Sequence, residues 1–260
     1  MNLLQTVFLL LIMTYCLPAV QAQDAQQKGL AIATTQDQAN NGFQSSIVNL
    51  TMVLKNKRGQ ESARQLVIKT IETANDGDQS MIIFNTPKDL KGTVTLTHTH
   101  KIGEDDQWVY LPAVGRVKRI ASDNKSGPFV GSEYAYEDLT SSEIEKYTYK
   151  YLGKEGDLDK VERIPVDKNS GYTKQIVYHN LAKNARMEKI EYYDRKGALL
   201  KTLTGTQWKL YLGKYWRAHY ANMINHQSGK STSLEVKVYE FNVGLSASAF
   251  TQDAMKRTRN

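Results

Sequence analysis

The side chains whose spacing best suits metal binding are those of two histidines. His98 and His100 stand two residues apart in "THTHK", on a segment typical of a strand, so both point to the same side. Two imidazoles on one side of a strand suit part of a zinc site, but such a site needs at least a third protein ligand. No third ligand is near in the sequence, so we predict no metal site.

Other candidate sites for catalysis or cofactor binding are weaker. The stretch "GKST" at 229–232 is similar to the end of a phosphate-binding loop, but the earlier glycine is missing and a strand follows instead of a helix. The carboxylate runs "GEDDQ" and "EGDLDK" have turn composition, where Asp and Glu are usually solvated. No serine stands in a glycine-flanked nucleophile elbow. The sequence therefore predicts no catalytic residue and no cofactor, which means a protein that is not an enzyme.

The first 22 residues are typical of a secretory signal peptide. An uninterrupted apolar run from Val7 to Leu17 is followed by Pro18 and by small residues at alternate positions in Val20-Gln21-Ala22. The alternative is an uncleaved membrane anchor, but the run is far shorter than the ~20 residues that span a bilayer. Cys16 could indicate a lipoprotein, but the bulky Tyr15 before it disfavours lipidation.

Residues 23–260 would then form the mature, periplasmic chain. Cys16 is the only cysteine, so this chain has no disulfide and no thiolate nucleophile. A chain of about 240 residues can bury one sizeable core, and no shift in composition marks a second domain. The net charge of +7 favours an anionic membrane surface or an acidic protein partner over nucleic acid. The alternative is charge that serves only solubility.

Turn-forming sequences recur along the chain and predict an antiparallel β-meander. Between them, apolar and polar side chains alternate, which predicts strands with one dry and one wet face. The turns are "KNKRGQ", "ANDGDQ", "IGEDDQ", "DKNSGY", "DRKGAL", "YLGKYW" and "HQSGKS". The sets predicted to share a face are Val48, Leu50, Met52 and Leu54; Val94 and Leu96; and Leu234, Val236 and Val238.

Helical signals are few. One helix is predicted around Ala25 to Ala39, ahead of the first strand. The stretch "TSSEIEKY" at 140–147 predicts a second, which Thr140 or Ser141 would cap and Glu143 would support in its first turn. The tail "SASAFTQDAMKRTRN" predicts a third, short helix.

The segment "DDQWVYLPAVGRVKRIASDNKSGPFVGSEYAYEDL", residues 105–139, concentrates aromatic, basic and glycine residues. It is followed in order by "EKYTYKYLG", "KNSGYTKQIVY", "IEYYDRKGALLKTL", "YLGKYW" and "NHQSGKST". This series resembles the exported outer-membrane lipoprotein-sorting proteins, the LolA-like family. The resemblance covers the chain from about Gly42 to about Phe250.

The resemblance implies a mainly β fold of the α+β kind: an unclosed antiparallel β half-barrel around an apolar cavity, with short covering helices. It implies a periplasmic carrier of lipid or lipoprotein acyl chains, with an inner-membrane exporter of the RND/MMPL type as partner. A regulatory module of the same fold, which senses envelope lipids and signals to a protein partner, is the alternative. The family has no catalytic residues to carry over.

The segment 105–139 also supplies candidate ligand-binding residues. Large aromatic side chains can line a pocket at modest entropic cost, although in a strand they are more often ordinary core. The flanking Gly127 and Gly131 allow unusual backbone angles in a loop that could cover the cavity. The residues predicted to form the wall or cover of the cavity are Trp108, Tyr110, Leu111, Phe129, Tyr134 and Tyr136.

A basic cluster, Arg116, Lys118 and Arg119, follows the aromatic strand. We predict that it docks on lipid head groups or on an acidic loop of the transporter. The alternative is a solvated hairpin edge.

The signal peptide predicts a mature protein that begins at Gln23. N-terminal sequencing of the exported protein, purified from the periplasmic fraction, should read Gln23 first. An intact Met1, or a lipidated Cys16 in the membrane fraction, would contradict this assignment.

Overall fold

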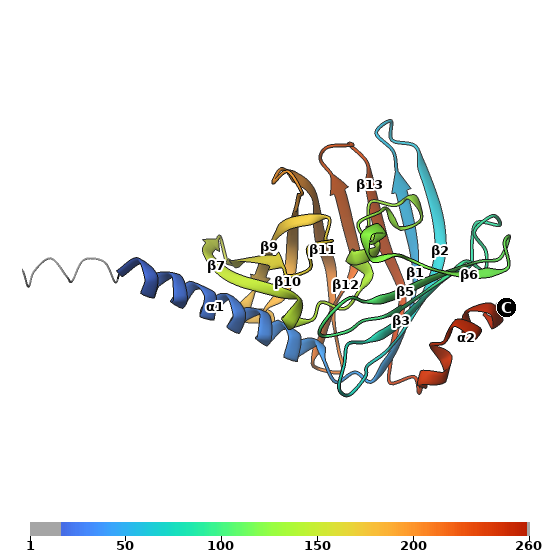
Figure 1. Ribbon diagram of the computed structural model, residues 1–260, viewed down its shortest axis with the longest axis horizontal. Helices are drawn as coiled ribbons and strands as arrows, with labels where there is room; N and C mark the ends of the chain where they lie inside the picture. The colour runs from blue at the N-terminus through green and yellow to red at the C-terminus, as the bar shows by residue number, and fades with distance from the viewer. Residues whose placement is uncertain (1–16, 259–260) are drawn as a thin grey trace, which may run out of the picture.

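The computed structural model describes residues 17–258 (Figure 1). Thirteen antiparallel strands form a single open sheet with a helix near each end of the chain, which confirms the predicted half-barrel. Of the predicted signal peptide, residues 1–22, the first 16 residues lie outside the described part. The helices are α1 (Leu17–Asn40) and α2 (Gln252–Arg257). The strands are β1 (Ser45–Lys55), β2 (Glu61–Ile71), β3 (Gln79–Phe84), β4 (Val94–His98), β5 (Asp106–Leu111), β6 (Arg116–Arg119), β7 (Tyr147–Glu155), β8 (Leu158–Pro165), β9 (Tyr172–Asn180), β10 (Arg186–Asp194), β11 (Leu199–Tyr211), β12 (Tyr215–Asn225) and β13 (Ser231–Phe241).

The predicted turns and the predicted terminal helices are confirmed. Each turn-forming sequence connects two consecutive strands. The "GKST" stretch lies at the β12–β13 hairpin, where Gly229 N donates to Asn225 O at 3.0 Å. α1 includes the predicted segment from Ala25 to Ala39, and α2 lies in the tail, where the Thr251 side chain accepts a hydrogen bond from Ala254 N.

Alternation is confirmed in β1 but breaks in β13. In β1, Val48 and its predicted partners all face one core. In β13, the register with β1 jumps by one residue between Val236 and Val238, which is a β-bulge. Beyond the bulge the faces exchange, so Val238 is exposed and Tyr239 packs against the core instead. The prediction that Val238 shares a face with Leu234 is therefore wrong.

The expectation of one wet face is wrong for β3 and β4. The outer side of these strands carries a second core, which includes Val94 and Leu96. Phe250 and Met255 from the C-terminal tail cover it and are themselves buried. Both sides of this part of the sheet are therefore dry, and the inner side faces the interior of the half-barrel.

The connection from β6 to β7 determines what fills that interior. These strands are consecutive in the chain but lie at opposite edges of the sheet, so residues 120–146, here called the crossing segment, traverse its inner side (Figure 1). Phe129 is fully buried there, with its ring centroid 5.7 Å from that of Phe84. The helix predicted at 140–147 is wrong, because only Ile144–Lys146 form one 3-10 turn. The whole crossing segment consists of short 3-10 turns joined by irregular backbone.

Buried polar contacts fix the crossing segment to the strands. Lys201 Nζ lies 2.6 Å from Asp138 Oδ2 and donates to Glu133 O at 2.9 Å. The two charged side chains are only 4% and 2% exposed. Tyr172 OH and Ala135 N also donate to the Asp138 carboxylate, at 2.8 and 2.7 Å. The ion pair is therefore well satisfied, as a buried pair must be to offset its desolvation.

Helix α1 covers the edge strand β7. The two are in close contact at Gly29, where an added Cβ would lie 2.8 Å from Tyr151 N, so a larger residue would force them apart. Tyr149 packs there against Ile32 and Ala33 of the helix. An uncovered edge strand invites pairing with other chains, so this contact also protects the sheet.

The Lys201–Asp138 pair gives a prediction for stability. Lys201→Met and Asp138→Asn each leave a buried partner unpaired and should each lower the free energy of unfolding by about 3–5 kcal/mol. The double variant should lose clearly less than the sum, because neither charge remains. Urea unfolding of the four proteins measures this coupling. Single variants as stable as the parent would show that the pair does not hold the crossing segment.

Candidate functional site

The inner side of the sheet contains a cavity of about 450 Å³, here called the inner cavity. One wall is formed by the C-terminal half of α1 and by residues 137–143 of the crossing segment. The other wall is formed by side chains of β9 to β12. Its volume lies within the range of ~300–1,000 Å³ that small-molecule sites occupy.

Part of the strand wall of the inner cavity is apolar, and arginine and glutamine side chains line the rest of it. Met187 and Ile190 from β10 and Leu203 from β11 line the apolar part, and all three belong to the main core. Met187 and Ile190 are three residues apart and would face opposite sides of a regular strand. A register shift between Met187 and Lys189 in the pairing with β9 brings both to the inner side.

Two tryptophans and an arginine stand in the same wall. The Arg186 guanidinium carbon lies 4.4 Å from the ring centroid of Trp208 and 4.8 Å from that of Trp216. Arg186 Nε also donates to Glu188 Oε1 at 2.9 Å. Trp208 Nε1 donates to Gly205 O at 3.0 Å, and a Cβ at Gly205 would lie 2.7 Å from the Trp208 ring. Glycine is thus required beneath Trp208, and the three large side chains form a fixed cation–π group.

Carboxylates line the facing wall. Burial raises the pKa of Asp78 to about 6 and that of Glu143 to about 7. Repulsion from Glu72 adds to the shift at Asp78, and repulsion from Asp78 adds to the shift at Glu143. Burial also raises the pKa of Asp37 from α1. These groups come from three separate segments, so their shared charge tends to separate the helix from the crossing segment as the pH rises.

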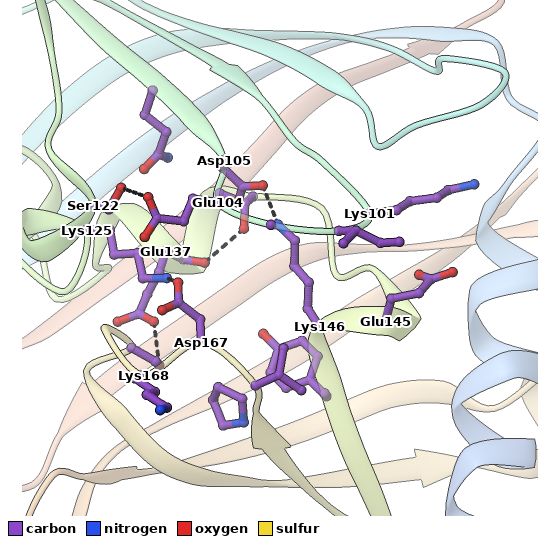
Figure 2. A pocket seen from close by; sticks show the side chains of 18 of the residues that line it. Lys101, Glu104, Asp105, Ser122, Lys125, Glu137, Glu145, Lys146, Asp167 and Lys168 are labelled. Atoms are coloured by element: carbon purple, nitrogen blue, oxygen red, sulfur yellow. Dashed lines mark hydrogen bonds and ion pairs between the residues drawn. The ribbon is translucent and has the colours of Figure 1, made fainter.

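A second cavity, of about 480 Å³, lies where the β4–β5 loop, the crossing segment and the β8–β9 loop meet (Figure 2). We call it the seam pocket, because the β4–β5 loop belongs to one half of the open sheet, β1–β6, and the β8–β9 loop belongs to the other half, β7–β13. Polar contacts join its walls: Lys125 pairs with Asp167, Lys146 with Asp105, and Glu104 accepts hydrogen bonds from Ser122 and Asn169. Charges that neutralise one another in this way stabilise a closed contact between the two halves of the sheet.

The two cavities are neighbours. Glu137, Thr140, Tyr147 and Gln175 line both of them, so the crossing segment separates one from the other. The Glu137 carboxylate accepts hydrogen bonds from Ser170 Oγ at 2.7 Å and from Gly171 N at 2.9 Å. These contacts hold the partition against the β8–β9 loop.

The structure places part of the predicted ligand wall on the outer side of the sheet. Trp108 and Tyr110 share a face, as predicted, but that face packs in the core beneath the C-terminal tail. Leu111, the next residue, is half-buried at the end of β5. None of the three lines the inner cavity or the seam pocket.

The remaining predicted ligand residues lie on the inner side as core. Phe129 and Tyr134 are buried, and Tyr136 packs against the same core, 5.5 Å from Phe129 between ring centroids. They fill the half-barrel and line neither cavity. The structure therefore does not bring the six predicted residues together, and their contact with cargo stays a prediction.

The basic cluster lies on β6, one edge of the sheet. Arg116, Lys118 and Arg119 are all exposed, and Arg119 pairs with Asp106 on the neighbouring strand. Their docking role stays a prediction.

The two histidines serve separate local contacts. His98 Nε2 lies 2.8 Å from Phe250 O, which attaches the C-terminal tail to β4. His100 Nδ1 lies 2.6 Å from Asp76 Oδ2, and this hydrogen bond raises the pKa of His100. Within residues 17–258, no three His, Cys, Asp or Glu side chains are grouped so that they could hold a metal ion.

The sequence reading missed Trp208, Trp216 and Arg186. "YLGKYW" predicts a turn, but Trp216 is its last residue and Trp208 lies three residues before it, so two of the three tryptophans of the sequence gather at this turn. That clustering was the available signal, because tryptophan beside exposed turns often marks a binding surface.

Comparison with known proteins identifies the relatives of this chain. A family model described as "Uncharacterized protein" matches residues 76–257. A solved structure from Vibrio parahaemolyticus, named as an outer membrane lipoprotein-sorting protein domain, is 50% identical. The match covers 89% of this chain and 100% of that one, with a TM-score of 0.86. No curated protein matches the sequence.

Two more distant structures share the fold. A DUF1329 family protein from Desulfovibrio piger is 24% identical with a TM-score of 0.82, over 89% of this chain and 99% of that one. A LolA superfamily protein from Nitrosomonas europaea is 22% identical with a TM-score of 0.69, over 86% and 97%. In the described part of the chain, neither helix has the length and apolar content needed to cross a bilayer.

The carboxylate wall predicts a pH dependence of stability. The folded-state pKa of Glu143 is raised from its ordinary value of 4.5 to about 7, so the folded protein binds this proton more tightly than the unfolded chain. The resulting stabilisation is complete below the unfolded pKa and is lost as the pH rises through about 7. Glu143→Gln should therefore raise Tm at about pH 8, by on the order of 2–4 °C, and should have no effect at about pH 4.

Thermal unfolding at both pH values measures this difference, with the exposed Glu240→Gln as matched control. A Glu143→Gln effect of the same size at both pH values would mean that ionisation of this carboxyl is not its cause.

Proposed function

This chain belongs to the outer-membrane lipoprotein-sorting, LolA-like family, and from this premise we propose that it is a periplasmic carrier. It would hold a lipid or lipoprotein acyl chain in the inner cavity and shield that chain from water between membranes. The proposal includes no catalytic step.

The observation that carries the proposal is the apolar part of the strand wall of the inner cavity. Transfer of an acyl chain into water costs ~0.8 kcal/mol per methylene, on the order of 12 kcal/mol for a sixteen-carbon chain. A carrier has to replace the lost membrane contacts with apolar surface, and Met187, Ile190 and Leu203 offer it. The crossing segment leaves these residues open while it covers the inner face of β1 to β3 with its own aromatic side chains.

The Arg186 group suits the polar end of such a cargo. A guanidinium held between Trp208 and Trp216 presents both cationic and aromatic surface beside an apolar wall. Ester and phosphate oxygens accept hydrogen bonds from guanidinium groups, and tryptophan prefers the boundary between apolar and polar surroundings. An amphipathic ligand therefore matches this cavity better than a purely apolar one.

We also propose an inner-membrane exporter of the RND/MMPL type as the partner, for which the resemblance is the only support. A carrier loads and releases its cargo, whereas a sensor of the same fold would change its affinity for a protein when cargo binds. The apolar wall serves either role, and the family relationship favours the carrier.

The proposal predicts that filling the inner cavity blocks cargo binding. Leu203→Trp adds volume inside the cavity and should weaken binding of a fluorescent fatty-acid probe at least ~10-fold, or about 1.4 kcal/mol. Thr206→Trp, on the exposed side of the same strand, is the matched control and should bind like the parent. Mass spectrometry of lipid extracted from periplasmic protein would identify the natural cargo. Equal probe affinity in a folded Leu203→Trp protein would place the cargo elsewhere.

A further inference from the structure

The tip of the β11–β12 hairpin carries an apolar residue where one is unfavourable. Leu212 and Gly213 both have positive φ, 51° and 69°, and Lys214 N donates to Tyr211 O at 3.0 Å. This is the backbone of a type I′ turn, in which Asn or Gly is strongly preferred at the first central position. A branched side chain at positive φ is a steric outlier.

The Leu212 side chain gains no packing in return. It is 64% exposed, and it belongs to none of the apolar cores of the described residues. An unfavourable backbone position that carries a solvent-exposed leucine does not serve folding. Such local strain points to a role for the side chain outside the folded chain itself.

Other exposed leucines lie near Leu212. Leu210 in the same hairpin and Leu181 in the β9–β10 turn are also exposed, 47% and 43%. Lys183 Nζ lies 5.3 Å from the ring centroid of Trp216, which brings the two turns together. We call the turns 181–184 and 209–214 the leucine rim.

Cations accompany the exposed leucines. Lys183, Lys209 and Lys214 are all exposed on the rim. Lys214 Nζ donates to Asn41 O, a contact that leaves its charge unneutralised. Apolar tips flanked by lysines and a tryptophan are the composition of segments that lie at a membrane–water interface.

The leucine rim stands at the opening of the inner cavity. Lys183, Asn184 and Lys214 of the rim also line the cavity, together with the nearby Trp216. A surface that held the rim would therefore face the route by which a cargo enters or leaves.

We propose that the leucine rim docks the protein on an anionic phospholipid bilayer, with Leu210, Leu212 and Leu181 inserted among the lipids and the lysines at the head groups. This inference rests on the proposed function, because it supplies the point of cargo transfer. The partner is a bilayer because the apolar side chains are separate tips on two turns, which suits a fluid surface, and because the lysines complement anionic lipid. The β5–β6 hairpin that carries the β6 cluster has one exposed large apolar residue among its described residues, Val114.

The decisive variant is Leu212→Asn. Asparagine suits the left-handed position, so Tm should stay level or rise, while binding to phosphatidylglycerol/phosphatidylcholine vesicles should weaken on the order of tenfold. Val114→Asn, at a 51% exposed residue in the β5–β6 turn, is the matched control and should bind like the parent. Lys183→Gln with Lys209→Gln should weaken binding by about fivefold per lysine, and added salt should reduce the difference.

Co-sedimentation with vesicles measures these affinities, and the fluorescent fatty-acid probe in vesicle-free solution measures cargo binding separately. Leu212→Asn should leave probe binding unchanged. Full vesicle binding by Leu212→Asn would overturn the proposal, as would a larger loss in a charge-reversed Arg116, Lys118 and Arg119 variant, which would place docking at β6. Vesicle binding that needs the rim in a protein that binds no probe would refute the carrier function and leave the docking surface intact.

Discussion

The passage of residues 120–146 across the inner side of the sheet is the constraint on which the rest of the structure depends. β6 and β7 lie at opposite edges of one open sheet, so the chain between them has no other short route. Its backbone polar groups become buried there and need partners. Both halves of the sheet provide them: Arg64 donates to Val130 O at 2.6 Å and Lys201 to Glu133 O at 2.9 Å. The buried charges of this interior therefore follow from topology and need no catalytic explanation.

The path of the crossing segment also determines which apolar surface of the half-barrel stays uncovered. Phe129 and Tyr134 from the crossing segment occupy the inner face of the first strands, so an acyl chain would find that part of the half-barrel already filled. At the seam, pairs such as Lys146–Asp105 satisfy the charges of the two halves against each other. The cavity with an open apolar wall is thus displaced to β10–β12, beneath α1. Topology, rather than local composition, sets the position of the candidate site.

Local signals predicted the local parts of the fold. Turn sequences fixed the hairpins because glycine at positive φ and short polar side chains act within a few residues. Alternation fixed the buried face of β1. The same signals could not show that β6 and β7 end at opposite edges, because that depends on the pairing of β1 with β13 across nearly 200 residues. The stretch 140–147 has a capping pattern for a helix, yet tertiary packing stretches it across the sheet, and intrinsic helix preference is too weak to resist this.

The candidate site was harder to predict because its strands depart from the two-residue period. Alternation shows which residues share a face only while that period holds, and a single inserted residue exchanges the faces. In β10, a register shift brings Met187 and Ile190 to the same side. In β11, Gln207 has a left-handed φ of 53°, and Trp208 lies over Gly205, three residues before it. Trp108 stands in a regular strand, so alternation predicts its face correctly, but that face packs in the outer core. The register shift and the left-handed residue direct these side chains into the cavity, and the same irregularities make their position unpredictable from alternation.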